Sequence, residues 1–230
     1  MGNPKIVVLT GAGVSAESGI STFRDSGGLW ENYDIMEVAS IQGWYKDKKL
    51  VLDFYNQRRR QLKDVEPNAA HYALAKLEEE FDVTLITQNV DNLHERAGSK
   101  NIIHLHGQLT QAKSTADDRL VYEIGHKEIN IGDKCEKGSQ LRPNIVWFGE
   151  PVPMIAEASR LSMQADIFII IGTSLNVYPA AGLVHYVKPH IPKYLIDPND
   201  CKTGDIKNLT FIKEKAGVGV PAIVDKLLEK

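Results

Sequence analysis

The chain has 230 residues, 43% of them hydrophobic and 25% charged, which is the composition of a soluble globular protein with one sizeable core and room for a small lobe. A net charge of −3 and an isoelectric point near 6.2 exclude a strongly basic surface, so we expect no nucleic-acid partner. Only two cysteines occur, and no apolar run reaches the length of a signal peptide's core or of a membrane span. We therefore expect a cytoplasmic protein with reduced thiols and no membrane contact.

The first predicted element is a buried strand over 5–10, and a glycine turn follows it. Gly11, Ala12 and Gly13 come directly after the strand, and the segment SGISTFRDSGGLW occupies 18–30. Glycines at this point let a backbone approach a pyrophosphate, so the turn indicates dinucleotide binding. The segment after it is rich in Ser and Gly and does not predict the helix and acidic second strand of a dehydrogenase. A tight turn without a ligand is the alternative, and redox chemistry is the least favoured reading.

The remaining elements alternate between helices and strands. The spacing of apolar residues predicts helices over 49–61, from the cap Asn68 onward, over 93–97 up to Gly98, after Pro179, and over 221–228. Short apolar runs predict strands over 83–87, 102–105, 165–171, 194–196 and 210–212, and we expect the core to resume over 144–148. This alternation predicts a doubly wound, mostly parallel, Rossmann-like α/β sheet. We expect one domain over 1–230, with a core at about 1–30, 68–107 and 144–230 and a small lobe at about 31–67, which is helical, and 108–143, which is polar.

Polar residues follow the predicted strand over 83–87. Gln88, Asn89 and Asp91 come at its carboxyl end, where open α/β sheets bind their ligands. An asparagine and an aspartate together can pair with both the donor and the acceptor of an amide such as a carboxamide. Capping of the following helix by Asn89 or Asp91 is the alternative.

Two further strand ends carry candidate functional groups. His104 and His106 end a predicted strand, and they point the same way if side chains alternate. A histidine beside other polar strand ends is a candidate general base, since its pKa lies near neutral, although a lone histidine is more often structural. Gly172, Thr173 and Ser174 follow the most hydrophobic strand. Their backbone donors and hydroxyls suit phosphate or ribose oxygens, unless they form a simple turn.

Five motifs, in this order, together resemble the sirtuins, the NAD-dependent protein lysine deacylases: GAGVSAESGISTFRD, TQNVDNLHERAG, LHG, VWFGE and GTSLNVYPAAG. The resemblance covers nearly the whole chain, from about Lys5 to the C-terminal VGVPAIV. It implies that NAD is a co-substrate, broken at its bond to nicotinamide, with no hydride transfer. The segment 18–30 resembles the family's flexible loop, which closes over the nicotinamide ribose.

The resemblance also implies roles for particular residues. His106 matches the catalytic base, and Asn89, which we count as catalytic with it, joins Asp91 in the pocket for the carboxamide. Phe23 would shield the reactive centre, and Arg24 would contact the phosphate side. The full set implied for NAD binding is Gly11, Ala12, Gly13, Glu17, Thr22, Phe23, Arg24, Trp30, Gln88, Asn89, Asp91, Gly172, Thr173, Ser174, Asp197, Asn199 and Ala216.

The implied substrate is an acyl-lysine in a protein or peptide. Its acyl oxygen attacks the ribose carbon that bears nicotinamide, His106 takes a proton from the ribose hydroxyls, and the products are lysine, nicotinamide and O-acyl-ADP-ribose. A dry, closed site stabilises the positive charge that develops. The family's peptide-pairing strand matches VWFGE, which places the substrate backbone beside Val146, Phe148, Gly149 and Glu150. Protein mono-ADP-ribosylation and a non-catalytic NAD sensor are the alternatives.

The helix over 49–61 indicates which acyl group is removed. Tyr55 and Arg58 share a face of this helix, so a phenol and a guanidinium fork together can bind a carboxylate. This spacing resembles the sirtuin class that removes succinyl and malonyl groups, and Ala39 resembles the small residue that leaves room for the longer chain. If the run of three arginines from Arg58 is instead a solvated basic face, the chain is a plain deacetylase.

The predicted lobe departs from the family, because most sirtuins hold zinc there with two Cys-x-x-Cys pairs. Cys135 is the only cysteine in 108–143, and Gly138 stands where its pair would need a thiol. One cysteine, His126 and a few aspartates do not form a zinc site of known spacing, so we expect no zinc and no other metal. The lobe then relies on short strands and on these apolar residues: Leu120, Val121, Tyr122 and Ile124.

Overall fold

In the computed structural model the residues described are 3–20, 29–30, 33–201 and 203–229. A six-stranded parallel sheet forms the larger part, in the order β11–β10–β9–β1–β4–β5. Its strands are β1 (Lys5–Thr10), β4 (Asp82–Thr87), β5 (Ile102–His104), β9 (Ile167–Ile171), β10 (Lys193–Ile196) and β11 (Leu209–Ile212). The predicted doubly wound α/β sheet is confirmed, and its strand order reverses between β1 and β9.

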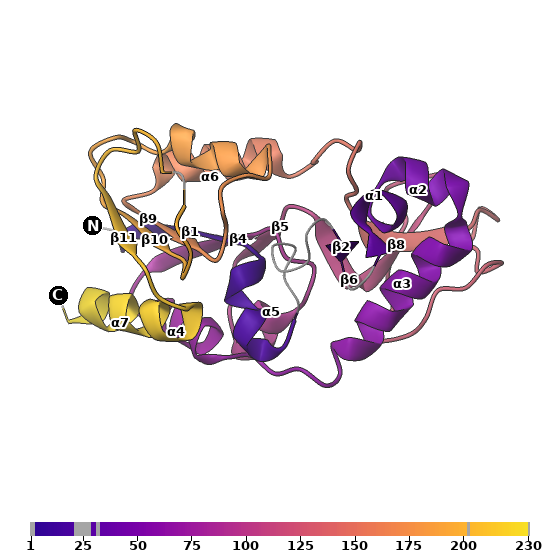
Figure 1. The fold of residues 1–230 in the computed structure, drawn as a ribbon, viewed down its shortest axis with the longest axis horizontal. Helices are drawn as coiled ribbons and strands as arrows, with labels where there is room; N and C mark the ends of the chain where they lie inside the picture. Colours follow the sequence, from indigo (N-terminus) through magenta and orange to yellow (C-terminus); the bar gives the residue numbers. More distant parts are fainter. Residues whose placement is uncertain (1–2, 21–28, 31–32, 202, 230) are drawn as a thin grey trace.

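Helices cover both faces of this sheet (Figure 1). On one face α4 (Ala69–Leu77) packs beside α7 (Ala216–Leu228). On the other face lie α6 (Ile155–Gln164) and the 3-10 helix η3 (Ala180–Tyr186). Strands covered on both sides need continuous apolar runs, and residues 6–9 of β1 are each 3% exposed or less. The β-branched runs seen in the sequence are therefore the buried centre of the sheet.

The small lobe lies beyond β5, on the right of Figure 1. An antiparallel sheet in the order β7–β6–β8 forms one part, with β6 (Gly107–Ser114), β7 (Val121–Glu123) and β8 (Leu141–Ile145). Three helices form the other part: α1 (Ile35–Val38), α2 (Ile41–Lys46) and α3 (Lys48–Gln61). The short β2 (Leu29–Trp30) pairs with β3 (Tyr33–Asp34). Buried residues of α3 pack on Leu109, Ala112 and Ile145 of the β7–β6–β8 sheet and on Ile129, which follows β7.

The main sheet passes into the lobe at Gly107. Only Leu105 and His106 separate the end of β5 from the start of β6. Gly107 has a φ of +79°, and a Cβ there would lie 1.9 Å from Asn144 O. Only glycine allows the chain to enter the second sheet at this point. His106 therefore stands at the junction of the two sheets.

The segment over 144–148, where we expected the core to resume, includes the end of the lobe sheet. β8 ends at Ile145. The Phe148 N–H instead donates to Ala39 O at 2.9 Å, and Phe148 O accepts from the Ile41 N–H at 3.1 Å. Pairing with a distant helical segment therefore takes the backbone out of the lobe sheet after Ile145.

Helix ends near glycine and proline also differ from the prediction. The helix expected at Pro221 begins at Ala216, so Gly217, Gly219 and the proline all lie inside α7. Burial of its apolar face overrides their low helix propensity. The segment after Pro179 forms a 3-10 helix, and α6 was not predicted. By contrast, α5 (Leu93–Ala97) ends at Gly98 as predicted.

The apolar residues expected to hold the lobe lie mostly near its surface. Val121 is 42% exposed, and Leu120, Tyr122 and Ile124 are only half-buried. The prediction was wrong for Val121, which lies on the edge strand β7 with one open side, whereas Ile124 packs against the lobe core. In the described part of the chain, no helix is both long enough and apolar enough to cross a membrane.

Candidate active site

The glycine turn after β1 packs directly against the turn after β9. The Gly11 N–H donates to Ile171 O at 2.9 Å, and the Gly13 N–H donates to Gly172 O at 2.9 Å. A Cβ on Gly13 would lie 2.6 Å from Gly172 Cα, so this contact needs two glycines. The turn continues into the 3-10 helix η1 (Ala12–Val14). These backbones meet where the strand order reverses, which is where open α/β sheets bind ligands.

A cluster of buried polar side chains lies at the end of β4. The Asn89 Nδ2 donates to Ser15 Oγ at 3.2 Å, and the Ser15 hydroxyl donates to Asp91 Oδ2 at 3.0 Å. Asp91 Oδ1 accepts the Leu93 N–H at 3.1 Å, although the cap position of α5 is Asn92 and not Asp91. Burial raises the pKa of Asp91, against these hydrogen bonds. No described residue bonds the Asn89 amide oxygen, which can therefore receive an N–H from a carboxamide.

His106 has the hydrogen bonding of a neutral base. Its Nδ1 lies 2.9 Å from Gln88 O. Because a carbonyl only accepts, Nδ1 carries the proton and Nε2 keeps its lone pair. Burial lowers the pKa of His106 below 6.5, and the Gln88 bond opposes this only in part. The other candidate, His104, is bonded to Glu95 Oε1 at 2.6 Å, which makes His106 the better base of the two.

The groups expected at the phosphate and ribose lie at neighbouring strand ends. The Gln88 amide donates to Thr173 Oγ1 at 3.3 Å, which links the ends of β4 and β9. Ser174 is half-buried beside it. Asp197 follows β10 and is 1% exposed, and its Oδ1 accepts the N–H of the exposed Asn199 at 3.0 Å.

Two other predicted NAD residues meet at the start of α7. Ala216 is its first residue and is 4% exposed. Glu17 Oε2 accepts the Gly217 N–H at 2.7 Å, so this carboxylate caps the helix. Thr22, Phe23 and Arg24 lie outside the described residues. Trp30 lies in β2, and its side chain is likewise outside the description.

The candidate acyl-binding residues are buried in the lobe. Tyr55 is 1% exposed and Arg58 is 4% exposed. The Trp147 Nε1 donates to the Tyr55 hydroxyl at 2.9 Å. Arg58 lines a pocket whose wall also includes Val90 and Asp91, which follow Asn89 in the chain. The helix face that carries Arg58 therefore reaches the polar cluster at the end of β4.

A solvated basic face on α3 is contradicted for two of its three arginines. Arg58 and the fully buried Arg59 are both inside the protein. The Arg59 Nε donates to Leu109 O at 2.6 Å, and burial lowers its pKa to about 10. Only Arg60 is at the surface, where it pairs with Glu128. Ala39, the small residue expected near the acyl chain, is 5% exposed and belongs to the lobe core.

The segment 146–150 is held at both ends. The Val146 N–H donates to His106 O at 2.9 Å, and the Phe148 backbone is bonded to residues 39 and 41 as described above. Glu150 pairs with Arg142 at 2.7 and 2.9 Å, and it also accepts the Trp147 N–H at 2.8 Å. Gly149 has a φ of +89° and makes the turn between these groups. The Glu150 carboxylate therefore holds this segment in shape.

Sequence reasoning missed three residues of the site. Ser15 bridges Asn89 and Asp91, although it stands inside the glycine-turn motif. Trp147 contacts Tyr55 from inside the VWFGE motif, and Arg142 precedes that motif. Their presence in or near the motifs was the only available signal.

A parallel sheet of this order, with its polar groups at the carboxyl ends of β1, β4 and β9, defines a dinucleotide-binding α/β protein. A model of the Sir2 family matches residues 11–179. The chain belongs to the Sir2 family, and the resemblance to the sirtuins is confirmed.

Curated relatives and a solved structure agree with this assignment. The chain is 54% identical over 228 residues to a protein of Bacteroides thetaiotaomicron named NAD-dependent protein deacylase, with 97% of each covered. It is 54% identical over 224 residues to a Helicobacter pylori protein of the same name, also with 97% of each covered. A solved complex of a Sir2 homolog with NAD superimposes with a TM-score of 0.88 at 41% identity, over 99% of this chain and 90% of that one.

Proposed function

We propose that the chain is an NAD-dependent protein lysine deacylase that removes succinyl and malonyl groups faster than acetyl groups, acting on acyl-lysine proteins of the cytoplasm. The relatives' shared name and the NAD complex of a homologue support the reaction. The observation that carries the acyl preference is the burial of Tyr55 and Arg58 on one helix, with Arg58 lining a pocket beside Asp91. A phenol and a permanently charged guanidinium fork recognise a carboxylate, and succinyl and malonyl groups end in one.

The residues at the strand ends have clear tasks in this reaction. NAD, when bound, supplies the ribose carbon that receives the acyl oxygen and the nicotinamide that leaves. The Asn89 amide oxygen and the Asp91 carboxylate orient the carboxamide. The His106 Nε2 takes a proton from a ribose hydroxyl, while its Nδ1–H bond to Gln88 O holds the ring and stabilises the imidazolium. One water is consumed when the amine leaves the acyl carbon, and the products we infer are lysine, nicotinamide and O-acyl-ADP-ribose.

The test compares succinyl-lysine and acetyl-lysine versions of one peptide, incubated with NAD and followed by mass spectrometry. Arg58→Met removes the buried guanidinium, and Arg60→Met is the matched control on the exposed face of the same helix. Losing a charge-assisted hydrogen bond of roughly 1.5–3 kcal/mol lowers the succinyl-to-acetyl ratio of kcat/KM by about 10- to 100-fold. We expect this only in Arg58→Met, and no reaction with His106→Tyr.

Three outcomes contradict the proposal in different ways. Acetyl removal favoured by the wild type, with no effect of Arg58→Met, identifies a plain deacetylase. ADP-ribosylated protein as the product identifies a transferase that uses the same pocket. No conversion of NAD by the wild type refutes an enzymatic role.

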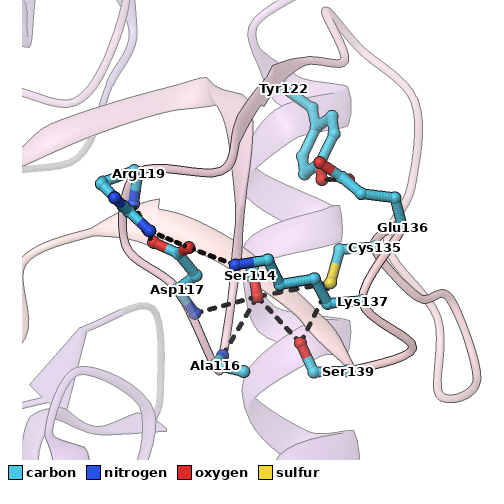
Figure 2. A network of polar contacts seen from close by, with 9 residues as sticks. All are labelled: Ser114, Ala116, Asp117, Arg119, Tyr122, Cys135, Glu136, Lys137 and Ser139. Carbon is cyan, nitrogen blue, oxygen red and sulfur yellow. Dashed lines mark hydrogen bonds and ion pairs between the residues drawn. The ribbon is translucent and has the colours of Figure 1, made fainter.

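We also propose that the small lobe is held without zinc. Figure 2 shows Cys135 lying against two hydroxyls. Its Sγ is 3.4 Å from Ser114 Oγ and 3.1 Å from Ser139 Oγ, and the two hydroxyls are 2.8 Å apart. Zinc in structural sites prefers four cysteine or histidine ligands, so one thiol and two hydroxyls do not suit it. Within the described ranges, no group of three His, Cys, Asp or Glu residues is arranged to hold a metal.

In this proposal, hydrogen bonds and ion pairs stabilise the lobe in the region where other sirtuins bind zinc. Ser114 Oγ accepts the N–H groups of Ala116 and Asp117 at 3.0 and 3.2 Å, which folds the turn after β6. The Asp117 carboxylate is bonded to Arg119 at 2.9 and 3.0 Å and to Lys137 at 2.7 Å (Figure 2). These two cations hold the pKa of Asp117 well below its ordinary value. The carboxylate therefore stays ionised and ties the two turns of the lobe together.

Metal analysis tests the absence of zinc. We expect protein expressed in zinc-supplemented medium to contain far less than one zinc per chain, and a strong chelator to leave its melting temperature unchanged. Ser114→Ala should lower stability by about 1–2 kcal/mol, since it removes the hydroxyl on which the turn depends. Stoichiometric zinc, or unfolding by the chelator, refutes the proposal.

A further inference from the structure

The Tyr55 hydroxyl has a fixed hydrogen-bonding role. The indole N–H of Trp147 points at it from 2.9 Å. An indole nitrogen can only donate, so the phenol oxygen accepts and must direct its own proton elsewhere. No residue in the described part of the chain accepts that proton. Burial raises the pKa of Tyr55, so the proton remains in place at neutral pH.

Trp147, which donates this hydrogen bond, is fixed by contacts to the face of its indole ring and to its backbone N–H. The Arg142 guanidinium carbon lies 3.4 Å from the centre of the Trp147 ring. Glu150 holds Arg142 by two hydrogen bonds of 2.7 and 2.9 Å, and it also accepts the Trp147 backbone N–H at 2.8 Å. Burial raises the pKa of Glu150, but these bonds outweigh it and keep the pKa below its ordinary value. The Trp44 ring packs nearby, 5.4 Å from the Trp147 ring centre.

We propose that Trp147 is a positioning residue for acyl selectivity: its indole N–H occupies the Tyr55 oxygen, so that the Tyr55 proton is offered to the carboxylate of an acidic acyl group. This inference rests on the proposed preference for succinyl and malonyl groups. Tyr55 and Arg58 then both act as donors toward one ligand. An ionised carboxylate, which only accepts, suits two donors, and an acetyl group has no such terminus.

The test replaces one indole at a time. Trp147→Phe keeps an aromatic ring beneath Arg142 but removes the N–H, and Trp44→Phe makes the same change in the neighbouring buried indole. Values of kcat and KM are measured for succinyl and acetyl peptides. We expect Trp147→Phe to lower the succinyl-to-acetyl ratio of kcat/KM about five-fold, chiefly through the succinyl KM, and Trp44→Phe to leave the ratio unchanged. In a Tyr55→Phe background, Trp147→Phe should not change the ratio further.

The possible failures are distinguishable. If Trp147→Phe lowers kcat/KM equally for both peptides, or for neither, the inference is overturned. A wild type that still prefers the succinyl peptide would in that case leave the proposed function standing. A wild type without that preference overturns both. If Trp147→Phe fails to fold, the NMR signal of the Trp147 indole ¹⁵N–¹H group is compared between the wild type and Tyr55→Phe. Loss of the Tyr55 hydroxyl removes the hydrogen bond, so the chemical shift of this signal should change. A signal that stays in place shows that the phenol does not accept this bond.

Discussion

Acidification is expected to destabilise the protein through the buried ring of His71. Its Nδ1 accepts the Asn68 N–H at 3.2 Å, which closes a capping box at the start of α4. Its Nε2 lies 3.5 Å from Ser15 Oγ, in the polar cluster of the site. The His94 ring is 4.8 Å away, so a proton on one ring opposes a proton on the other. Burial lowers the pKa of His71 to about 4.

The lowered pKa fixes the direction and the size of the effect. As the pH falls below 6.5, the unfolded chain binds a proton that the folded chain refuses until about pH 4, so stability decreases across that window. The difference between 6.5 and about 4, at about 1.4 kcal/mol per pH unit, gives a loss of about 3 kcal/mol, of which about 2 kcal/mol is lost by pH 5. The pKa of His94 is also lowered, mainly by burial, and adds to the loss.

Urea unfolding at pH 7 and pH 5 measures this contribution. His71→Gln places at the same position an amide that can accept the Asn68 N–H but does not titrate. We expect the variant to lose about 2 kcal/mol less than the wild type between the two pH values. His190→Gln, at an exposed histidine, should follow the wild type. A His71→Gln variant that loses as much as the wild type would show that His71 titrates normally in the folded protein.

Two further predictions concern the site itself. Because the active form of His106 is neutral and burial lowers its pKa, the acid limb of the kcat/KM profile should fall below pH 6.5, and a limb above that value contradicts the assignment. Gly172→Ala should destabilise the protein by more than about 2 kcal/mol and abolish NAD binding, since its φ is +61° and the new Cβ would lie 2.4 Å from Val14 N. Gly132→Ala, with φ +98° and open space, should cost only about 1 kcal/mol, and equal losses would refute the steric argument.

The sheet and the groups at its strand ends were predictable because their signals are local. A continuous apolar run followed by glycine marks β1 and β9, and polar residues directly after β4 must lie at the carboxyl edge of the sheet. His106 was singled out by its place at such an end.

The missed features depend on contacts between distant parts of the chain. Trp147 and Tyr55 are 92 residues apart, so no pattern within the VWFGE motif indicates that the indole serves the phenol. The burial of Arg58 could not be distinguished from a solvated arginine run without knowing what covers α3. The start of α7 was missed because glycine and proline lower local helix propensity, whereas packing on α4 decides the outcome.

His106 is hydrogen-bonded to both sheets of the protein. Its ring is tied to Gln88 at the end of the main sheet, and its backbone carbonyl is tied to the Val146 N–H after the lobe sheet. A displacement of the lobe therefore acts on the backbone of His106, whereas the hydrogen bond to Gln88 fixes its ring to the main sheet. Under the proposed function, a protein substrate that docks on the lobe would therefore act on the position of the His106 ring through this backbone hydrogen bond.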